Sequence, residues 1–157
     1  MILISHRGNI DGPNQDKENT HRYIQEALDA GYHVEIDVWL INDKLFLGHD
    51  EPEISVCLDW ITSRRQKLWV HAKNEEALFY LTSNTNLTVF FHEKEKYSII
   101  HNGRDIDGNI IKGAIWAHNL EKLSKNCIIP LLNLNDLPQK PKTKILGICS
   151  DYVELIK

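Results

Sequence analysis

Residues 33–50 include three side chains whose types and spacing suit metal binding or proton transfer. Glu35 and Asp37 are two residues apart in a run that alternates with β-branched residues, and His49 follows them. Residues two apart in a strand project from the same face, so the two carboxylates lie side by side. Like charges at this spacing are costly unless a cation or a proton lies between them. The stretch therefore predicts a divalent-metal site with a histidine nearby.

A tight hairpin is expected to bring His49 back to the two carboxylates. Residues 42–43 are Asn-Asp, a pair that suits a two-residue turn between antiparallel strands. With the turn centred there, Val38 faces Leu47, and His49 returns beside Asp37. The histidine is thereby delivered to the metal-binding end of the strand.

Other polar side chains that could take part in chemistry stand at the ends of further predicted strands. They are His6 and Arg7 after the first strand, His71 and Lys73 at the third, and Glu93 after the fourth. Histidines near their ordinary pKa can exchange protons at neutral pH. Cationic side chains together with a metal ion can stabilise the charge that develops on a phosphoryl group.

The elements that must position these residues alternate between strand and helix in the first half of the chain. Helices are expected at 21–30, 53–65 and 75–83, and 131–144 is expected to be irregular connection. Strands are expected at 1–5, 33–39 with its return to 47, 68–72, 87–91, 97–100, 110–116, 126–130 and 144–149. Alternation indicates a parallel sheet, and eight strands predict an α/β fold, a reduced (β/α)8 TIM-type barrel with few helices in its second half. An open α/β sheet is the alternative.

Four short motifs in this order resemble the glycerophosphodiester phosphodiesterase family, within the superfamily of phosphatidylinositol phospholipase C-like barrels. They are His6-Arg7-Gly8, Glu18-Asn19-Thr20, Glu35-Ile36-Asp37 and His49-Asp50. The resemblance covers about the first third of the chain, and His71-Ala72-Lys73 matches only in part.

The resemblance implies a metal-dependent phosphodiesterase with a small phosphodiester as its substrate. His6 and His49 would be the general acid and base. Glu35 and Asp37 would bind a divalent cation, which is Mg or Ca in most relatives.

The resemblance further implies that Arg7 and Lys73 contact the phosphate. His71 stands where the family usually has a metal-binding carboxylate, and an imidazole there makes Mn possible. Four residues are candidates for supporting roles at the site: Glu18, Asn19, Glu93 and Trp116.

The composition is that of an ordinary globular protein, and we expect residues 1–157 to form a single domain. The net charge of −4 gives no basic field that would attract nucleic acid or an anionic membrane. No apolar run approaches the roughly 20 residues of a membrane-spanning helix, so we expect no membrane insertion. Three widely spaced cysteines and no signal-peptide pattern favour a cytoplasmic protein with reduced thiols. The sequence leaves the oligomeric state open.

Three functions remain open at this point. The first is hydrolysis of a glycerophosphodiester or a similar small diester. The second is a lyase reaction that stops at a cyclic phosphate. The third is a barrel that binds a phosphorylated ligand without turnover.

Overall fold

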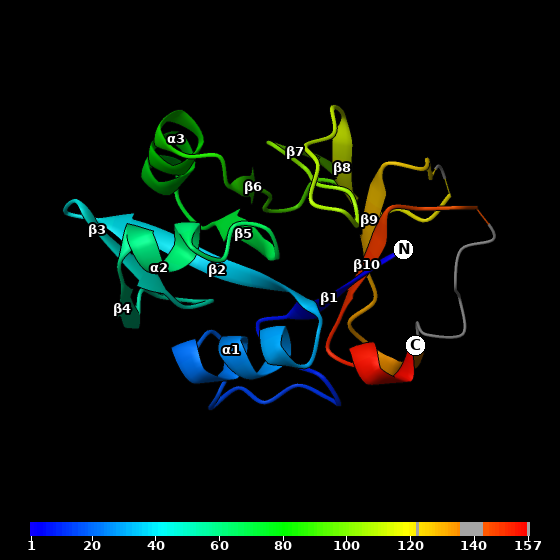
Figure 1. Cartoon of the computed structure of the whole chain (residues 1–157), viewed down its shortest axis with the longest axis horizontal. Coiled ribbons are helices and arrows are strands. Elements are labelled where there is room, and N and C mark those ends of the chain that lie inside the picture. The colour runs from blue at the N-terminus through cyan, green and yellow to red at the C-terminus, as the bar shows by residue number, and fades with distance from the viewer. Residues whose placement is uncertain (122, 136–142, 157) are drawn as a thin grey trace.

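The computed structural model describes residues 1–121, 123–135 and 143–156, and its main feature is a curled ten-stranded mixed sheet (Figure 1). The strands are β1 (Ile2–His6), β2 (His33–Ile41), β3 (Lys44–Leu47), β4 (Ile54–Val56), β5 (Leu68–Ala72), β6 (Thr88–Phe90), β7 (Tyr97–Ile100), β8 (Ala114–Ala117), β9 (Cys127–Pro130) and β10 (Gly147–Ser150). Their order is β4-β3-β2-β1-β10-β9-β8-β7, and β5 with β6 branches from β2. The helices are α1 (His21–Asp29), α2 (Leu58–Thr62), α3 (Glu75–Asn84) and the 3₁₀ helix η2 (Val153–Leu155).

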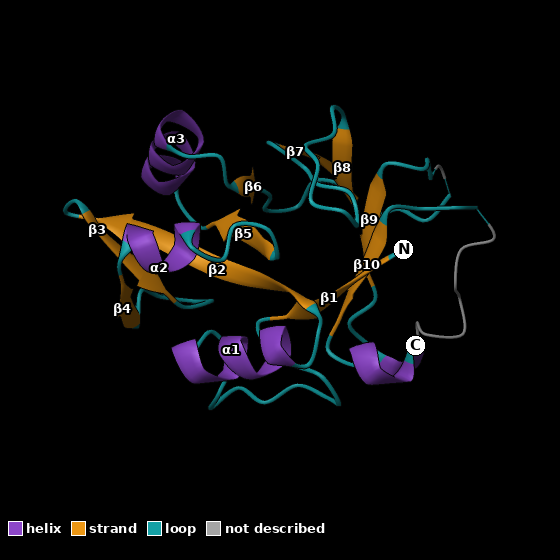
Figure 2. Ribbon diagram, in the orientation of Figure 1, coloured by secondary structure: helices purple, strands orange, loops and turns teal. Residues whose placement is uncertain are grey.

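The prediction of a reduced (β/α)8 barrel is wrong, and so is the alternative of an open α/β sheet. The structure is mostly strand, curled into a mixed half-barrel, with α1, α2 and α3 all beside the β2 half of the sheet (Figure 2). In the described residues from β7 to β10, no α-helix separates one strand from the next. β7 runs antiparallel to β8, and β3 and β4 form an antiparallel extension of β2. An isolated bridge between Val89 and His101 links β6 to the residue after β7.

The two faces of the curled sheet follow the alternation of the sequence. Val34, Ile36 and Val70 pack on one face with the apolar residues of α1 and α3, as the alternation predicts. The opposite, concave face holds a second cluster of fully or nearly fully buried residues that includes Trp69, Phe90 and Trp116. The chemistry-bearing residues of β1, β2 and β5 share the parity of this second face, so they lie at one end of the concave core.

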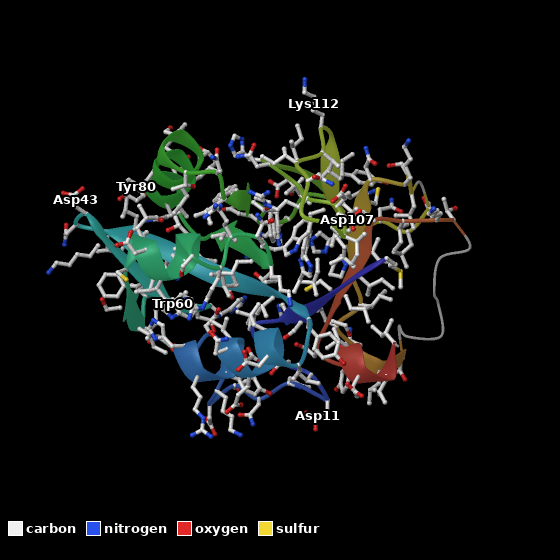
Figure 3. All side chains as sticks on the ribbon, viewed as in Figure 1. Asp11, Asp43, Trp60, Tyr80, Asp107 and Lys112 are labelled. Carbon is white, nitrogen blue, oxygen red and sulfur yellow. The ribbon has the colours of Figure 1, made fainter. Side chains whose placement is uncertain are left out.

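The predicted hairpin is confirmed in both its turn and its register. Asn42 and Asp43 have φ values of 48° and 62°, which is the left-handed pair that a tight hairpin requires. Val38 pairs with Leu47, and the exposed Asp43 projects from the tip of the turn at the left of Figure 3. The end of β3 therefore returns to the middle of β2.

The predicted helix at 53–65 is wrong over its first half. Residues 54–56 form β4, which pairs with β3, and α2 is only five residues long. The predicted irregular connection at 131–144 lies partly outside the described residues, because residues 136–142 are not described. The strand expected at 144–149 begins instead at Gly147.

Polar caps fix the starts of the two longer helices. Thr20 Oγ1 accepts a hydrogen bond from the Tyr23 amide at the start of α1, which is the contact of an N-cap residue. Asn74 caps α3 in the same way, and its amide also exchanges two hydrogen bonds with the backbone of Leu40. The second cap therefore ties α3 to β2. Among the described residues, no helix has the length and apolar character needed to cross a membrane.

Candidate active site

The site forms where β1, β5 and β10 end beside the middle of β2. β1 pairs in parallel with β2 and β10, and β2 pairs in parallel with β5. The register sets His6 opposite Glu35 and Asp37 opposite His71. Parallel strands present their carboxyl ends at one edge, so these side chains meet although they are far apart in the sequence.

Asp37 is the most heavily contacted acid of the site. Its Oδ2 lies 2.9 Å from Arg7 Nε and accepts a hydrogen bond from Asn19 Nδ2 at 2.9 Å. Its Oδ1 lies 2.9 Å from His71 Nδ1 and 3.6 Å from Lys73 Nζ. Burial alone would raise the pKa of Asp37, but the hydrogen bond to His71 and the charge of Arg7 outweigh it and hold this pKa well below its ordinary value. Asp37 is therefore a buried, fully compensated carboxylate.

Glu35 differs from Asp37 because one of its carboxylate oxygens lacks a hydrogen-bond partner among the described residues. The side chain is buried, and Oε2 has no hydrogen-bond partner among the described residues. The nearest cationic candidates are His6 Nε2, 3.9 Å from Oε2, and His71 Nδ1, 3.9 Å from Oε1. Burial, and then the charge of Asp37, raise the pKa of Glu35. A buried carboxylate oxygen without a partner is costly, which marks this atom as a place for a cation or a ligand.

Glu35, Asp37 and His71 form a group that could hold a metal ion. One ligand atom from each residue can be chosen so that all three lie within 4.8 Å of one another. His71 Nε2 lies 3.3 Å from the carbonyl oxygen of His92, while Nδ1 faces Asp37. Both ring nitrogens thus face oxygen acceptors, and a neutral imidazole has only one N–H to offer. A metal ion at Nδ1 or a second ring proton satisfies this arrangement.

His6 is held by a carboxylate from the far end of the chain. Its Nδ1 lies 2.7 Å from Asp151 Oδ1, directly after β10. Asn9 Nδ2 donates to the same carboxylate at 2.7 Å and also to Glu18 at 2.8 Å. Burial would lower the pKa of His6, but the hydrogen bond to Asp151 and the charge of Glu35 outweigh it and raise this pKa above its ordinary value. The ring is therefore fixed with its second nitrogen, Nε2, toward Glu35.

His49 approaches the site from the hairpin side. Gly48, with φ of 149°, precedes it, and a Cβ at Gly48 would lie 2.1 Å from the carbonyl oxygen of Glu51. Glycine is therefore required for this turn. The His49 side chain is 41% exposed, and its Nδ1 lies 2.7 Å from Asp50. Partial burial, and then the charge of Arg7, lower the pKa of His49.

Two adjoining cavities meet at Arg7 and His49. The inner cavity, about 200 Å³, is lined by His6, Arg7, Glu35, His49, His71, Phe90, His92, Trp116, His118, Pro130 and Leu132. The outer cavity, about 400 Å³, is lined by Arg7, Gln15, Glu18, Asn19, His49, Asp50 and Glu53. The first is called the inner chamber below, and the second the vestibule.

The supporting candidates fall in different places. Glu18 pairs with Arg7 at 3.1 Å, and Asn19 exchanges two hydrogen bonds with Asp37, so both hold site residues in position. Glu93 is exposed and lines a third cavity with Lys94, Glu95, Lys96, His118, Asn119 and Leu120. This cavity shares His118 with the inner chamber, which Glu93 does not line. Trp116 is buried in the concave core and lines the inner chamber.

Sequence reasoning missed several residues of the site. Asp151 and Asn9 hold His6, and His92 stacks on His71 with ring centroids 4.4 Å apart. Burial, and then the charge of His71, lower the pKa of His92 to about 4. Asp151 and His92 each follow the carboxyl end of a strand, β10 and β6, at the same edge of the sheet as the site. This position after a predicted strand was the sequence signal that could have indicated them.

No model of a known protein family and no curated protein matches this chain. The resemblance to the glycerophosphodiester phosphodiesterases therefore depends on the motif residues alone.

Proposed function

We propose that this protein is a metal-dependent phosphodiesterase that cleaves a small phosphodiester by acid–base catalysis between two histidines. The observation that carries the proposal is the buried group of Glu35, Asp37 and His71, with ligand atoms within 4.8 Å, beside a chamber that His6 and His49 line. Metal ligands and two proton carriers at one cavity are the parts that phosphodiester cleavage needs.

The side chains present fit a divalent ion. Glu35 Oε2 is buried without a hydrogen-bond partner among the described residues, and His71 directs Nδ1 toward the carboxylates. Glu35, Asp37 and His71 would hold the ion. Two carboxylates suit Mg or Ca, and the imidazole shifts the preference toward Mn and other transition metals. Once bound, the ion would supply a positive charge that stabilises the phosphoryl oxygens.

The two histidines divide the proton transfers between them. Asp151 holds Nδ1 of His6, which leaves Nε2 as the atom that gives or takes a proton in the chamber. His49 stands at the junction of the chamber and the vestibule, where water and one alcohol group have access. Each proton transfer contributes about 10²–10⁴-fold to the rate in enzymes of this kind.

Arg7 and Lys73 have unequal parts in this proposal. Arg7 lines both cavities, so its guanidinium is the cation next to a phosphate at their junction. Lys73 Nζ lies 3.6 Å from Asp37 and compensates the charge of that carboxylate. Lys73 thus supports the metal ligand, and contact with the phosphate falls to Arg7.

The test is turnover of small glycerophosphodiesters with and without Mg²⁺, Ca²⁺ or Mn²⁺, followed by phosphorus NMR. We expect metal-dependent cleavage that falls by 10²–10⁴-fold in His6→Ala and in His49→Ala. His101→Ala is the matched control, because His101 is exposed and lies outside both cavities. Turnover without added metal that survives chelation, or unchanged rates in both variants, would refute the proposal.

The same experiment separates the remaining alternatives. A cyclic phosphate as the final product identifies a lyase, and binding without turnover identifies a phosphate-binding protein. A diester whose adjacent hydroxyl is methylated should be inert if that hydroxyl is the nucleophile, because intramolecular attack gains from proximity. Rapid cleavage of this analogue would indicate attack by water.

A further inference from the structure

The inner chamber has two halves of different chemistry. The first is charged or ionisable and includes Arg7, Glu35 and His71. The second consists of the apolar side chains of Phe90, Trp116, Pro130 and Leu132, with the rings of His92 and His118 at its border. A phosphate bound beside Arg7 therefore shares the chamber with these apolar side chains.

The apolar half is a rigid, stacked wall. The rings of Phe90 and Trp116 have centroids 4.3 Å apart and planes 15° apart. His71 stacks on the same Phe90 at 5.1 Å, with planes 4° apart. Phe90 and Trp116 are 1% and 3% exposed, so the wall is set by the packed core behind it.

The vestibule on the other side of the phosphate position is polar. Gln15, Glu18, Asp50 and Glu53 line it together with Arg7, and its volume of about 400 Å³ is twice that of the inner chamber. A hydroxyl group there can exchange hydrogen bonds with side chains and water. The two alcohol groups of a diester would thus meet unlike surroundings.

We propose that the apolar half of the inner chamber binds one of the two alcohol groups and selects a short apolar group over a polyol, while the vestibule takes the polar alcohol. The proposal rests on the proposed function only for the position of the phosphate. The chamber of about 200 Å³ is smaller than the roughly 300–1,000 Å³ of pockets for drug-sized ligands, so the group has to be short. A hydroxyl placed against Phe90 and Leu132 loses its bonds to water without replacement.

The experiment compares two diesters, glycerophosphopropanol and glycerophosphoglycerol, which differ by two hydroxyls on one alcohol. We expect kcat/KM to favour the propyl diester by about 30-fold or more, because each of the two unpaired hydroxyls costs at least about 1 kcal/mol. Leu132→Trp narrows the chamber and should lower kcat/KM for the propyl diester. For the methyl diester, glycerophosphomethanol, kcat/KM should stay within about twofold of the wild-type value. Leu134→Trp is the matched control, since Leu134 is 51% exposed and lies outside the chamber.

A binding measurement keeps this inference separate from the proposed function. Calorimetric titration with propylphosphonate and with 2,3-dihydroxypropylphosphonate needs no turnover. Tighter binding of propylphosphonate that weakens in Leu132→Trp supports the chamber even if no diester is cleaved. Equal affinity for the two phosphonates, no binding of either, or an unchanged preference in Leu132→Trp overturns it.

Discussion

Asp151 holds His6 through a single 2.7 Å contact, and this pair gives the first prediction at the scale of single residues. Asp151→Asn should lower kcat by about 10- to 100-fold with little change in KM, since a neutral amide holds the ring less firmly and no longer stabilises its charged form. Asp151→Glu should restore part of the loss. Steady-state kinetics across a range of pH provide the measurement.

A merely structural role for Asp151 would give a different pattern. The variant would lose thermal stability, while kcat of the folded fraction and its pH profile stayed as in the wild type. Such a result would remove Asp151 from the proton-transfer machinery.

His71 gives a second prediction at this scale, because an imidazole ligand would shift the metal preference of the proposed site. With an imidazole beside two carboxylates, activity should be higher with Mn²⁺ than with Mg²⁺ or Ca²⁺. His71→Glu should reverse the order, since all three ligands would then be oxygens. Metal titrations followed by activity and by calorimetry provide the comparison. An identical metal order in the wild type and in His71→Glu would show that His71 is not a ligand.

The residues that sequence alone could predict are those whose partners follow from strand parity. Glu35, Asp37 and His71 share one face of two neighbouring strands, and alternation is enough to bring them together. Asp151 follows a predicted strand but shares no motif with His6 and lies 145 residues away, so only the pairing of β1 with β10 shows that the two are partners. Long-range pairs of this kind leave no local pattern in the sequence.

At the scale of elements, turn chemistry was a better guide than apolar spacing. Asn42 and Asp43 adopt the left-handed conformation that their types favour, and the register follows from it. The spacing of Ile54, Leu58 and Ile61 fits a helix, yet 54–56 forms β4. A short apolar run does not distinguish a helix from a strand. Residues 54–56 form a strand because they pair with the free edge of β3.

Two buried tryptophans on β5 and β8 give a prediction about these strands. Trp69 Nε1 donates to His33 Nδ1 at 3.1 Å, whereas Trp116 Nε1 has no hydrogen-bond partner among the described residues. Trp69→Phe should therefore lower the free energy of unfolding by about 1–3 kcal/mol more than Trp116→Phe does. Trp69→Phe leaves His33 Nδ1 without its hydrogen bond, whereas Trp116→Phe removes an N–H that has no partner among the described residues. Urea denaturation of both variants measures the difference. Equal losses would mean that the hydrogen bond to His33 contributes nothing.

At the scale of the whole molecule, the barrel expectation failed in the second half of the chain. The first half does alternate strand and helix, with α1 and α3 packed on the sheet. From β7 on, the described strands follow one another without α-helices, and β7 reverses direction. Eight apolar runs set the number of strands expected, but the direction of each strand depends on connections that the pattern does not encode.

The pH dependence of stability gives a further prediction for the whole molecule. Burial, and then the charge of Lys67, lower the pKa of His33 from 6.5 to about 4. The neutral ring accepts a hydrogen bond from Trp69. As the pH falls, His33 is protonated in the unfolded chain before it is protonated in the folded one. The contribution of His33 to the free energy of unfolding is therefore fully present above pH 6.5 and is lost as the pH drops toward 4. The loss should be on the order of 2 kcal/mol.

His33→Gln keeps a hydrogen-bond acceptor for Trp69 without a titrating group. Its unfolding free energy should vary less between pH 7 and pH 4.5 than that of the wild type, and His101→Gln serves as the exposed control. Parallel curves for the wild type and His33→Gln would assign the acid sensitivity to other groups.

The junction of β1 with β10 also orders events during synthesis. A ribosome adds about 5–20 residues each second, so roughly 7–30 s separate the emergence of His6 from that of Asp151. During this interval β2 and β5 can already pair and bring the three candidate metal ligands together. The nascent chain could thus capture an ion well before its histidine acquires a carboxylate partner. Under the proposed function, metal capture would precede proton transfer in the life of each molecule, and a chain cut before β10 would bind the metal ion without cleaving a diester.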